Sequence, residues 1–348
     1  MAQPVKLASN KSISPTLLTE GASPWKRELA RAITDPKVLL KRLGLESHLS
    51  LVDDNAPFKC LVTDSFIDKI EEGNINDPLL RQVLPLTEEN NIKIQRAGIT
   101  DPVGDISAMT SPGLLHKYHG RALLISTGAC AIHCRYCFRR HYPYQESSCS
   151  SKAIDEATDY LKSHREIDEI ILSGGDPLVL DNEKLARLIS KLEEVTQLKT
   201  LRIHSRLPIV LPSRIDNGLL QLLKTSRLQV VMVIHANHVN ELQGNEIRKL
   251  QQLNNAGITL LNQSVLLKGV NDDADALINL SKRLLECKTL PYYLHMLDPV
   301  AGAMHFSVSE DHALKLKAQL EKSLPGYLVP KLVREITGKQ SKSAIFRI

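Results

Sequence analysis

The sequence predicts an α/β fold, a partial (β/α)6 barrel with a helical N-terminal region. From Arg121 onward, short apolar runs rich in β-branched residues alternate with amphipathic stretches of helical period. Such alternation is typical of a parallel sheet whose strands are joined by right-handed helical crossovers. The apolar runs are nearly continuous, as expected for strands that helices cover. Unusual polar residues follow these runs, where parallel strands usually carry their functional groups.

Six strands and the helices between them make up the expected barrel. The strands are expected at 121–127, 169–174, 199–205, 228–235, 258–267 and 290–297, and the helices near 151–164, 182–195, 215–225, 243–256 and 273–287. A further helix is expected near 308–323, before a short apolar run at 327–333. A closed eight-stranded barrel needs two more clear units, so we expect a partial barrel.

The chain divides into four regions. Residues 1–23 are polar and rich in proline and serine, as in a loose tail. In residues 24–105, helical periodicity runs from Trp25 to Leu43 and returns near 63–84, with breaks at Pro36 and at 73–78, and 88–105 is interpreted as a polar linker. Residues 106–335 are expected to form the barrel, and 336–348 a C-terminal segment.

The composition is that of an ordinary soluble protein. The chain has 348 residues, of which 43% are hydrophobic and 24% charged, with a net charge of +5. This mild excess permits acidic partners without requiring nucleic acid. Because no apolar run approaches the roughly 18 residues of a membrane span and the N-terminus lacks the apolar core of a secretory signal, we expect a cytoplasmic protein without a membrane partner.

Three cysteines after the first expected strand are the strongest chemical signal. Cys130, Cys134 and Cys137 are spaced C-x3-C-x2-C. A [4Fe–4S] cluster usually takes four cysteine ligands, so three leave one iron open to a small molecule. A structural zinc site is the alternative and needs a fourth ligand, for which the candidates are His133, His141 and Cys149. Structural zinc modules usually carry paired half-sites, which are absent here, so the triplet favours an iron–sulfur cluster and radical chemistry. Cys60, Cys149 and Cys287 are scattered, and buried packing explains them adequately.

Polar residues also lie at the ends of the remaining five expected strands. Since the carboxyl ends of parallel strands meet at one edge of a sheet, we expect these residues to lie together. They are Gly174-Gly175-Asp176-Pro177 after the second strand, His204-Ser205-Arg206 and His235 at the ends of the third and fourth, Gln263 and Ser264 late in the fifth, and Asp298 after the sixth.

These features resemble those of the radical S-adenosylmethionine (SAM) enzymes. Further segments resemble lysine 2,3-aminomutase and its relatives, from about residue 60 to the C-terminus; they are DPLLRQVLP (77–85), PGLLHKY (112–118), CRYCFRRH (134–141), RIHSRLPIVLPSRI (202–215) and LLNQSVLLKGVND (260–272). The likeness includes the short bacterial form that makes (R)-β-lysine for the modification of elongation factor P. Longer catabolic members carry an additional C-terminal segment, whereas this chain stops six residues past Lys342.

The resemblance implies three cofactors and assigns residues to each. The three cysteines would ligate the [4Fe–4S] cluster, and the SAM site would be lined by Tyr136, Ser173, Gly174, Gly175, Asp176, His235 and Gln263. Pyridoxal phosphate (PLP) would be held by Lys342 as a Schiff base, with Lys117 and Arg121 near its phosphate. The family often has a proline two residues after this lysine, where Ala344 stands here, so Lys339 remains an alternative. Without the resemblance, a lysine this near the C-terminus would be interpreted as a solvated surface charge.

The resemblance also implies the substrate contacts. Arg139 matches the position that binds the carboxylate of lysine, for which a guanidinium fork is well suited. Asp298 matches one partner of the distal ammonium, and Glu335 stands where the family commonly has Asp, with one more methylene. Two acids favour lysine over glutamate, because two buried carboxylates facing a third would cost several kcal/mol.

The expected function is therefore a radical SAM, PLP-dependent isomerase that converts L-α-lysine to β-lysine. The resemblance implies a link to elongation factor P and its lysyl-transferring ligase, and self-association, although no interface is evident in the sequence. The Arg-rich segments lack interleaved aromatics, so nucleic-acid binding is not expected. Two alternatives remain at this point: an aminomutase for another amino acid, and a non-catalytic, zinc-stabilised RNA-binding protein.

Overall fold

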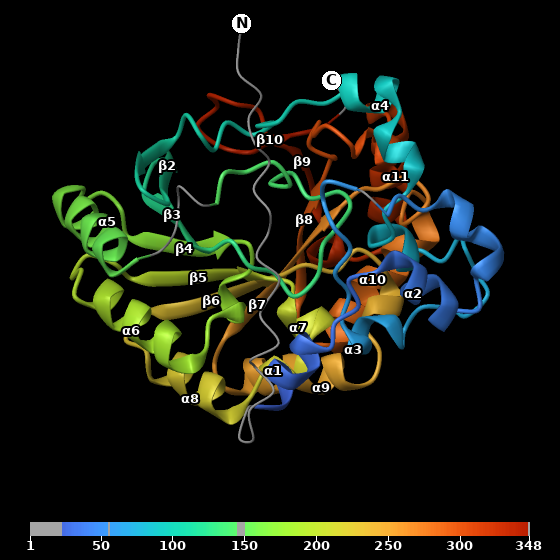
Figure 1. Cartoon of the computed structure of the whole chain (residues 1–348). Helices are drawn as coiled ribbons and strands as arrows, with labels where there is room; N and C mark the ends of the chain where they lie inside the picture. Colours follow the sequence, from blue (N-terminus) through green and yellow to red (C-terminus); the bar gives the residue numbers. More distant parts are fainter. Residues whose placement is uncertain (1–22, 55, 145–149, 347–348) are drawn as a thin grey trace, which may run out of the picture.

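Ten strands form one curved sheet in which the order of the strands in space follows their order in the chain (Figure 1). The computed structural model describes residues 23–54, 56–144 and 150–346. The strands are β1 (Met109–Ser111), β2 (Leu114–Tyr118), β3 (Arg121–Thr127), β4 (Glu169–Gly174), β5 (Thr200–Ser205), β6 (Gln229–Ile234), β7 (Thr259–Val265), β8 (Leu290–His295), β9 (Lys331–Arg334) and β10 (Ser343–Ala344). Strands β3 to β9 are parallel, and β1, β2 and β10 pair antiparallel at the two ends.

The six expected strands are all present, and the α/β fold class of the prediction is confirmed. The sheet is nevertheless larger than predicted, because β9 pairs in parallel with β8 and adds a seventh parallel strand. Strand β9 comes from the second half of the apolar run at 327–333, of which the first half is a 3-10 turn at Gly326–Leu328. The neighbouring strands are level: Ile125 pairs with Ser173, and Ser205 pairs with Ile234. This register aligns the carboxyl ends of the strands at one edge.

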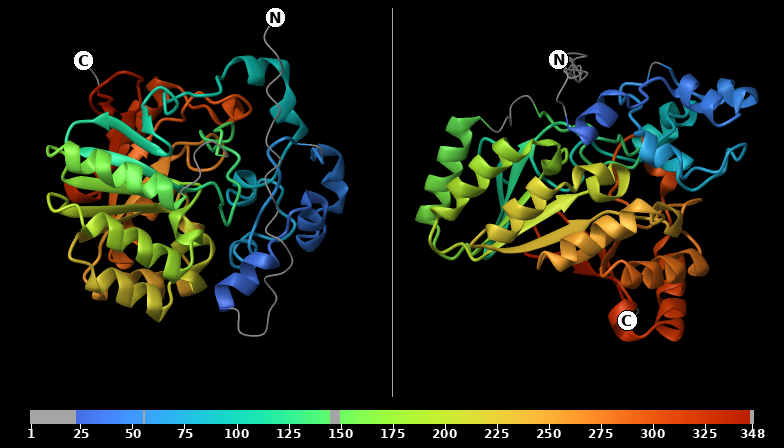
Figure 2. Two further views of the ribbon diagram at one scale, coloured as in Figure 1. Left: turned by 60° about the vertical axis from the view of Figure 1, so that its left-hand side comes forward. Right: turned by 90° about the horizontal axis from the view of Figure 1, so that it is seen from below.

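Helices cover the outer, convex face of the sheet (Figure 2). They are α5 (Ser151–Ser163), α6 (Asn182–Glu193), α8 (Asn217–Thr225), α9 (Asn245–Asn255), α10 (Ala274–Glu286) and α11 (Glu310–Ser323), with the single turn α7 (Leu207–Val210) after β5. Their positions follow from local sequence. Helix α6, for example, starts where the Asp181 carboxylate accepts a hydrogen bond from Lys184 N. It buries Leu185, Leu188, Ile189 and Leu192, which share one face of the helix.

The N-terminal region packs against the open side of the barrel (Figures 1 and 2). It contains α1 (Pro24–Ala30), α2 (Pro36–Arg42), α3 (Asp64–Ile67) and α4 (Ile92–Arg96). Its buried residues Trp25, Leu39 and Phe66 belong to the same hydrophobic cluster as Leu207 and Ile209 of the barrel. The N-terminal region therefore covers the edge at which the functional residues of the barrel were expected.

Two expectations for this region are wrong. The stretch 63–84 is mostly turns, with only α3 and a 3-10 turn at Leu80–Gln82 regular, because Gly73 and the buried Asp77 turn the chain. The stretch 88–105 is not a solvated linker: it contains α4, and its carboxylates Glu89 and Asp105 are buried in ion pairs.

The predicted tail at 1–23 lies outside the described residues except for Ser23. Cys60 and Cys287 are buried and free, as expected, and Cys149 lies outside the described residues. Within the described part of the chain, no helix combines the length and the apolar character that crossing a bilayer requires.

Candidate active site

A cavity of about 1600 Å³ opens at the carboxyl ends of the parallel strands. This is larger than the roughly 300–1,000 Å³ of an ordinary small-molecule site, so there is room for more than one ligand. All sixteen predicted site residues line the cavity. They are Lys117, Arg121, Cys130, Cys134, Tyr136, Cys137, Arg139, Ser173, Gly174, Gly175, Asp176, His235, Gln263, Asp298, Glu335 and Lys342. The structure thus brings residues from most of the strand ends into a single site.

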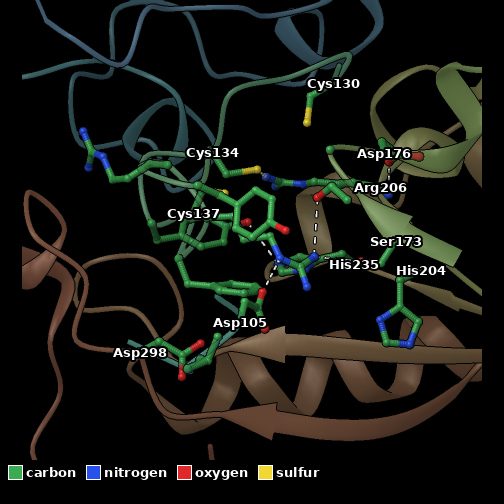
Figure 3. A pocket seen from close by; sticks show the side chains of 18 of the residues that line it. Asp105, Cys130, Cys134, Cys137, Ser173, Asp176, His204, Arg206, His235 and Asp298 are labelled. Carbon is green, nitrogen blue, oxygen red and sulfur yellow. Dashed lines mark hydrogen bonds and ion pairs between the residues drawn. The ribbon is translucent and has the colours of Figure 1, made fainter. Parts of the chain in front are cut away.

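The three cysteines gather at one end of this cavity (Figure 3). They lie on the loop after β3, where Cys137 N donates to Cys134 O at 3.0 Å. Burial raises the pKa of Cys137 to about 11 and raises that of Cys130 well above its usual value, so both are neutral thiols without a metal. Among the described residues, no three His, Cys, Asp or Glu side chains are grouped to hold one metal ion.

The side chains that could complete a zinc site have other contacts. His133 Nδ1 lies 2.8 Å from Lys59 O, and His141 Nε2 lies 3.1 Å from Ala301 O. The third candidate, Cys149, lies outside the described residues.

The glycine-rich segment after β4 holds the start of the cysteine loop by backbone contacts. Gly175 N donates to Thr127 O at 2.7 Å, and Asp176 N donates to Ala129 O at 2.8 Å. A Cβ on Gly175 would lie 2.2 Å from Ala129 O, so only glycine allows this approach. Gly174 has φ +125°, which also favours glycine. The segment predicted as a ligand-binding loop is thus also the support of the cysteine loop.

The Asp176 side chain organises the adjacent strand end. Its carboxylate accepts hydrogen bonds from Ser205 Oγ, Arg206 N, Leu207 N and Leu178 N. Burial nevertheless raises its pKa to about 6, although these hydrogen bonds oppose the shift. Asp176 therefore connects the ends of β4 and β5 beside the cysteines.

Tyr136 and His235 form one wall of the cavity. Their rings stack at 5.6 Å and 25°, and the Tyr136 hydroxyl lies 3.1 Å from His235 Nε2. Asn237 Nδ2 donates to the same hydroxyl at 2.7 Å. Burial and the nearby Arg206 lower the pKa of His235 to about 3. The wall is thus flat, aromatic and neutral, and it is suited to stacking against a planar ring.

Arg139 and Lys117 share one carboxylate, that of Asp105. Arg139 Nε lies 2.7 Å from Asp105 Oδ2, and Lys117 Nζ lies 2.6 Å from Asp105 Oδ1. Arg139 Nη1 also donates to Ser173 Oγ at 3.0 Å. Burial alone would raise the pKa of Asp105, but the two cations more than offset this and hold it below its usual value. The pair of cations provides a positive region suited to anionic groups, with Asp105 as the buried counter-ion that they share.

Lys342 lies in the cavity and Lys339 does not. Lys342 Nζ donates to Glu335 Oε2 at 3.0 Å and lies 5.6 Å from the centroid of the Tyr293 ring. Lys339 is exposed, outside the cavity lining. Glu335 Oε1 accepts a hydrogen bond from the Tyr118 hydroxyl at 2.7 Å and lies 3.5 Å from Lys117 Nζ. Burial would raise the pKa of Glu335, but Lys342 and these neighbours hold it below its usual range.

Asp298 lies away from the cysteines in the same cavity (Figure 3). Burial raises its pKa to about 7; Lys342 opposes this shift, and Glu335 adds to it. The ligand-free site therefore holds a carboxyl group that takes up a proton near neutral pH. A bound cation would favour its ionised form.

Two neutral imidazoles have open hydrogen-bonding positions in the cavity. Among the described residues, His204 Nε2 at the end of β5 and His295 Nε2 at the end of β8 are buried without a hydrogen-bond partner. Burial lowers the pKa of both rings well below the usual value, with Lys342 contributing to each. Buried polar atoms usually have a hydrogen-bond partner, so these two nitrogens are available to a ligand in the cavity.

Several residues of the site were missed as functional candidates. Glu89 pairs with Arg135 at 2.6 Å and Arg140 at 2.8 Å, which fixes the cysteine loop from the N-terminal side. Glu241 pairs with Arg206 at 2.9 Å. Burial would raise the pKa of both glutamates, but their arginine partners hold it below the usual range. An acid and a distant arginine give no local sequence signal, so these pairs could not be predicted from spacing.

Comparison with known proteins gives consistent matches. The model of the radical SAM superfamily matches residues 124–280. The "L-lysine 2,3-aminomutase" of Escherichia coli strain K12 is 46% identical over 333 residues, covering 95% of this chain and 96% of that protein. That of Haemophilus influenzae is 47% identical over 322 residues (92% and 94%), and that of Clostridium subterminale 32% identical over 324 residues (92% and 77%). A solved radical SAM methyltransferase from Sphaerobacter thermophilus covers 64% of this chain and 68% of that protein at 15% identity, with a TM-score of only 0.47.

Proposed function

Because the chain belongs to the lysine 2,3-aminomutase family of the radical SAM superfamily, we propose that it is an isomerase that moves the α-amino group of L-lysine to the β-carbon. One observation carries this proposal. A single cavity contains three thiols at one end, the lysine–glutamate pair of Lys342 and Glu335, the carboxyl group of Asp298, and the guanidinium of Arg139. These are the groups that a metal cluster, an aldehyde cofactor and a substrate with a carboxylate and two amines need.

The residues of the cavity fit the cofactors of the family. Cys130, Cys134 and Cys137 would hold the [4Fe–4S] cluster, and the Tyr136–His235 wall together with the glycine-rich segment would hold SAM. Lys342 would hold PLP, with Lys117 and Arg121 near its phosphate. When bound, the cluster supplies single electrons to SAM, and PLP supplies an aldehyde that bonds reversibly to amino groups.

The remaining charges are suited to lysine. Arg139 is buried and oriented by Asp105 and Ser173, so its guanidinium is pre-organised for a carboxylate. Asp298 and Glu335 offer two carboxyl groups for the distal ammonium. Burial of these groups excludes water and strengthens their pairing with the substrate. A substrate with a second carboxylate in place of the ammonium would face two acids.

The finer parts of the proposal rest on the resemblance to the short bacterial form. They are the (R)-configuration of the β-lysine product, its use in modifying elongation factor P, and a functional link to the lysyl-transferring ligase. The higher identity to the Escherichia coli and Haemophilus influenzae relatives than to that of Clostridium subterminale supports the choice of this form. Mass analysis of elongation factor P from cells with and without this gene tests the link.

The proposal extends to the organisation of the chain. Residues 106–335 form the radical SAM core, 24–105 its helical cover, and 336–348 the segment that carries the PLP lysine. The protein resides in the cytoplasm and self-associates. Expression of residues 106–348 alone tests whether the core folds without residues 24–105. Cell fractionation tests the location, and sedimentation tests self-association.

An oxygen-free assay tests the function directly. Reconstituted protein is incubated with SAM, PLP, dithionite and L-lysine, and the products are separated on a chiral column. We expect (R)-β-lysine, formed only when all components are present. Parallel reactions with glutamate, ornithine and arginine test the substrate, since conversion of one of these in preference to lysine would contradict the assignment. Wild-type protein that binds iron and sulfide yet never consumes SAM would contradict the reaction class.

A further inference from the structure

The guanidinium of Arg206 contacts one of the cavity thiols directly. Its Nη1 lies 2.7 Å from Cys134 Sγ. Figure 3 shows the side chain near the cysteine loop, and only 6% of the residue is exposed. A cation held this close to a sulfur ligand acts on the electron density of any metal group that the sulfur binds.

Arg206 is fixed in this position from several sides. Its Nη2 donates to Gln82 Oε1 at 2.7 Å and to Glu241 Oε2 at 2.9 Å, and both of these partners are fully buried. The rings of Phe66 and Tyr136 flank the guanidinium at 5.4 and 5.7 Å. The fork therefore cannot leave the thiol without breaking a buried ion pair.

The position of this cation has a definite consequence for redox chemistry. The reduction potential of an iron–sulfur cluster depends on the net charge around it and on hydrogen bonds to its sulfurs. Reduction by one electron makes no bond and breaks none, but it adds a negative charge to the cluster. A donor on a ligand sulfur stabilises that added charge, and a nearby carboxylate opposes it.

We propose that Arg206 is a positioning residue that raises the reduction potential of the cluster through Cys134, and that Glu241 limits this effect as its buried counter-ion. The proposal rests on the assignment of the cluster to the three cysteines. It concerns only the transfer of one electron from a low-potential reductant, and it needs neither PLP nor lysine.

Two single variants test the proposal because they shift the potential in opposite directions. R206Q removes the cation, and E241Q removes the anion while leaving the guanidinium at the sulfur. The potential is measured by an anaerobic redox titration with dithionite, followed by electron paramagnetic resonance, without SAM. At a fixed ambient potential we expect the ratio of reduced to oxidised cluster to fall about tenfold in R206Q, a shift of about 59 mV for one electron. In E241Q the ratio should rise.

Two further proteins separate this effect from damage to the fold. Removing one partner of a buried pair is destabilising, so R206Q/E241Q, which leaves no unpaired charge, should have a potential between those of the single variants. Arg214 provides a control: it is fully buried and donates to Leu178 O and Leu180 O at 2.6 and 3.0 Å, and both acceptors lie outside the cysteine loop. R214K should change thermal stability but leave the potential unchanged.

The outcomes are distinct. Opposite shifts in R206Q and E241Q, at wild-type iron and sulfide content, support the proposal. Where R206Q does not load the cluster, a rise in E241Q carries the support, and an unchanged or lowered potential in E241Q overturns the proposal. An unchanged potential in R206Q with wild-type iron and sulfide content would also overturn the proposal, and it would leave the proposed function unaffected. Wild-type protein that assembles no cluster would overturn both.

Discussion

Glu335 and Lys342 form an ion pair of 3.0 Å between neighbouring strands at one end of the sheet, at the edge of the large cavity. Glu335 follows β9, and Lys342 precedes β10, whose two residues pair with Arg334 and Val333. The short antiparallel strand therefore fixes the lysine next to its counter-ion. This placement explains why one of two lysines in a C-terminal segment can serve a buried site while the other stays in solvent.

K342A is expected to lose PLP, because Lys342 alone presents an amine to the cavity among residues 336–346. The visible absorbance of bound PLP should disappear, and activity should fall by at least about 10²-fold from misplacement of the cofactor. K339A is the matched control and should retain both properties. Retention of PLP absorbance in K342A, with its loss in K339A, would assign the cofactor to Lys339 instead.

Asp298 should make lysine binding dependent on pH near neutrality. Its pKa of about 7 in the ligand-free protein lies above the usual value of about 3.9. Below pH 7 the carboxyl group must lose a proton before it pairs with an ammonium, so KM for lysine should fall as the pH rises from about 6 to about 8. D298N should lose this dependence and raise KM by roughly 30- to 100-fold, or about 2–3 kcal/mol.

The same group should affect the stability of the ligand-free protein. Between the unfolded and folded pKa values the folded state binds more protons, so the free energy of unfolding should decrease as the pH rises from about 4 to about 7. In urea unfolding, the free energy of unfolding should therefore increase less for the wild-type protein than for D298N when the pH is raised from about 4 to about 7. Identical pH profiles for the two proteins would show that Asp298 titrates normally.

Asp105 should support both anion sites of the cavity at once. D105N removes the shared counter-ion of Arg139 and Lys117, so each cation loses one of the contacts that fix its position. We expect KM for lysine to rise and PLP affinity to fall, each by about tenfold, or about 1.4 kcal/mol. Absorbance titration with PLP and lysine saturation curves measure the two effects. D168N, in a solvent-exposed pair with Lys199, should change neither.

The opposite result is also informative for Asp105. If its carboxylate only competed with ligands for the two cations, D105N would tighten the binding of PLP and lysine. Tighter binding of both would therefore contradict a positioning role.

Much of this site could be predicted from the sequence, because its signals are local. Two motifs can be recognised from short stretches of sequence: the spacing of Cys130, Cys134 and Cys137, and the run Ser173–Asp176. The alternation of strands and helices predicts that they lie close together. Asp105 could not be predicted in the same way, since its partner Arg139 is 34 residues away and an isolated acid in a polar stretch suggests a solvated charge. Strand β9 was missed because four residues give no periodicity, and pairing with β8 decides its structure.

G175A should separate the support of the cysteine loop from the chemistry of its thiols. The added methyl group would lie 2.2 Å from Ala129 O and 2.8 Å from Gly128 C, and backbone atoms cannot move aside as a flexible side chain can. Relief requires the loop before Cys130 to shift, at a cost of about 1–3 kcal/mol by analogy with overpacked cores. We expect the metal-free variant to unfold at a lower temperature and to bind less iron and sulfide on reconstitution. G326A is the control, because a Cβ there meets no atom within 4 Å. Wild-type stability and full cluster loading in G175A would mean that the two loops can separate without harm, and the close contact between them would then have no structural role.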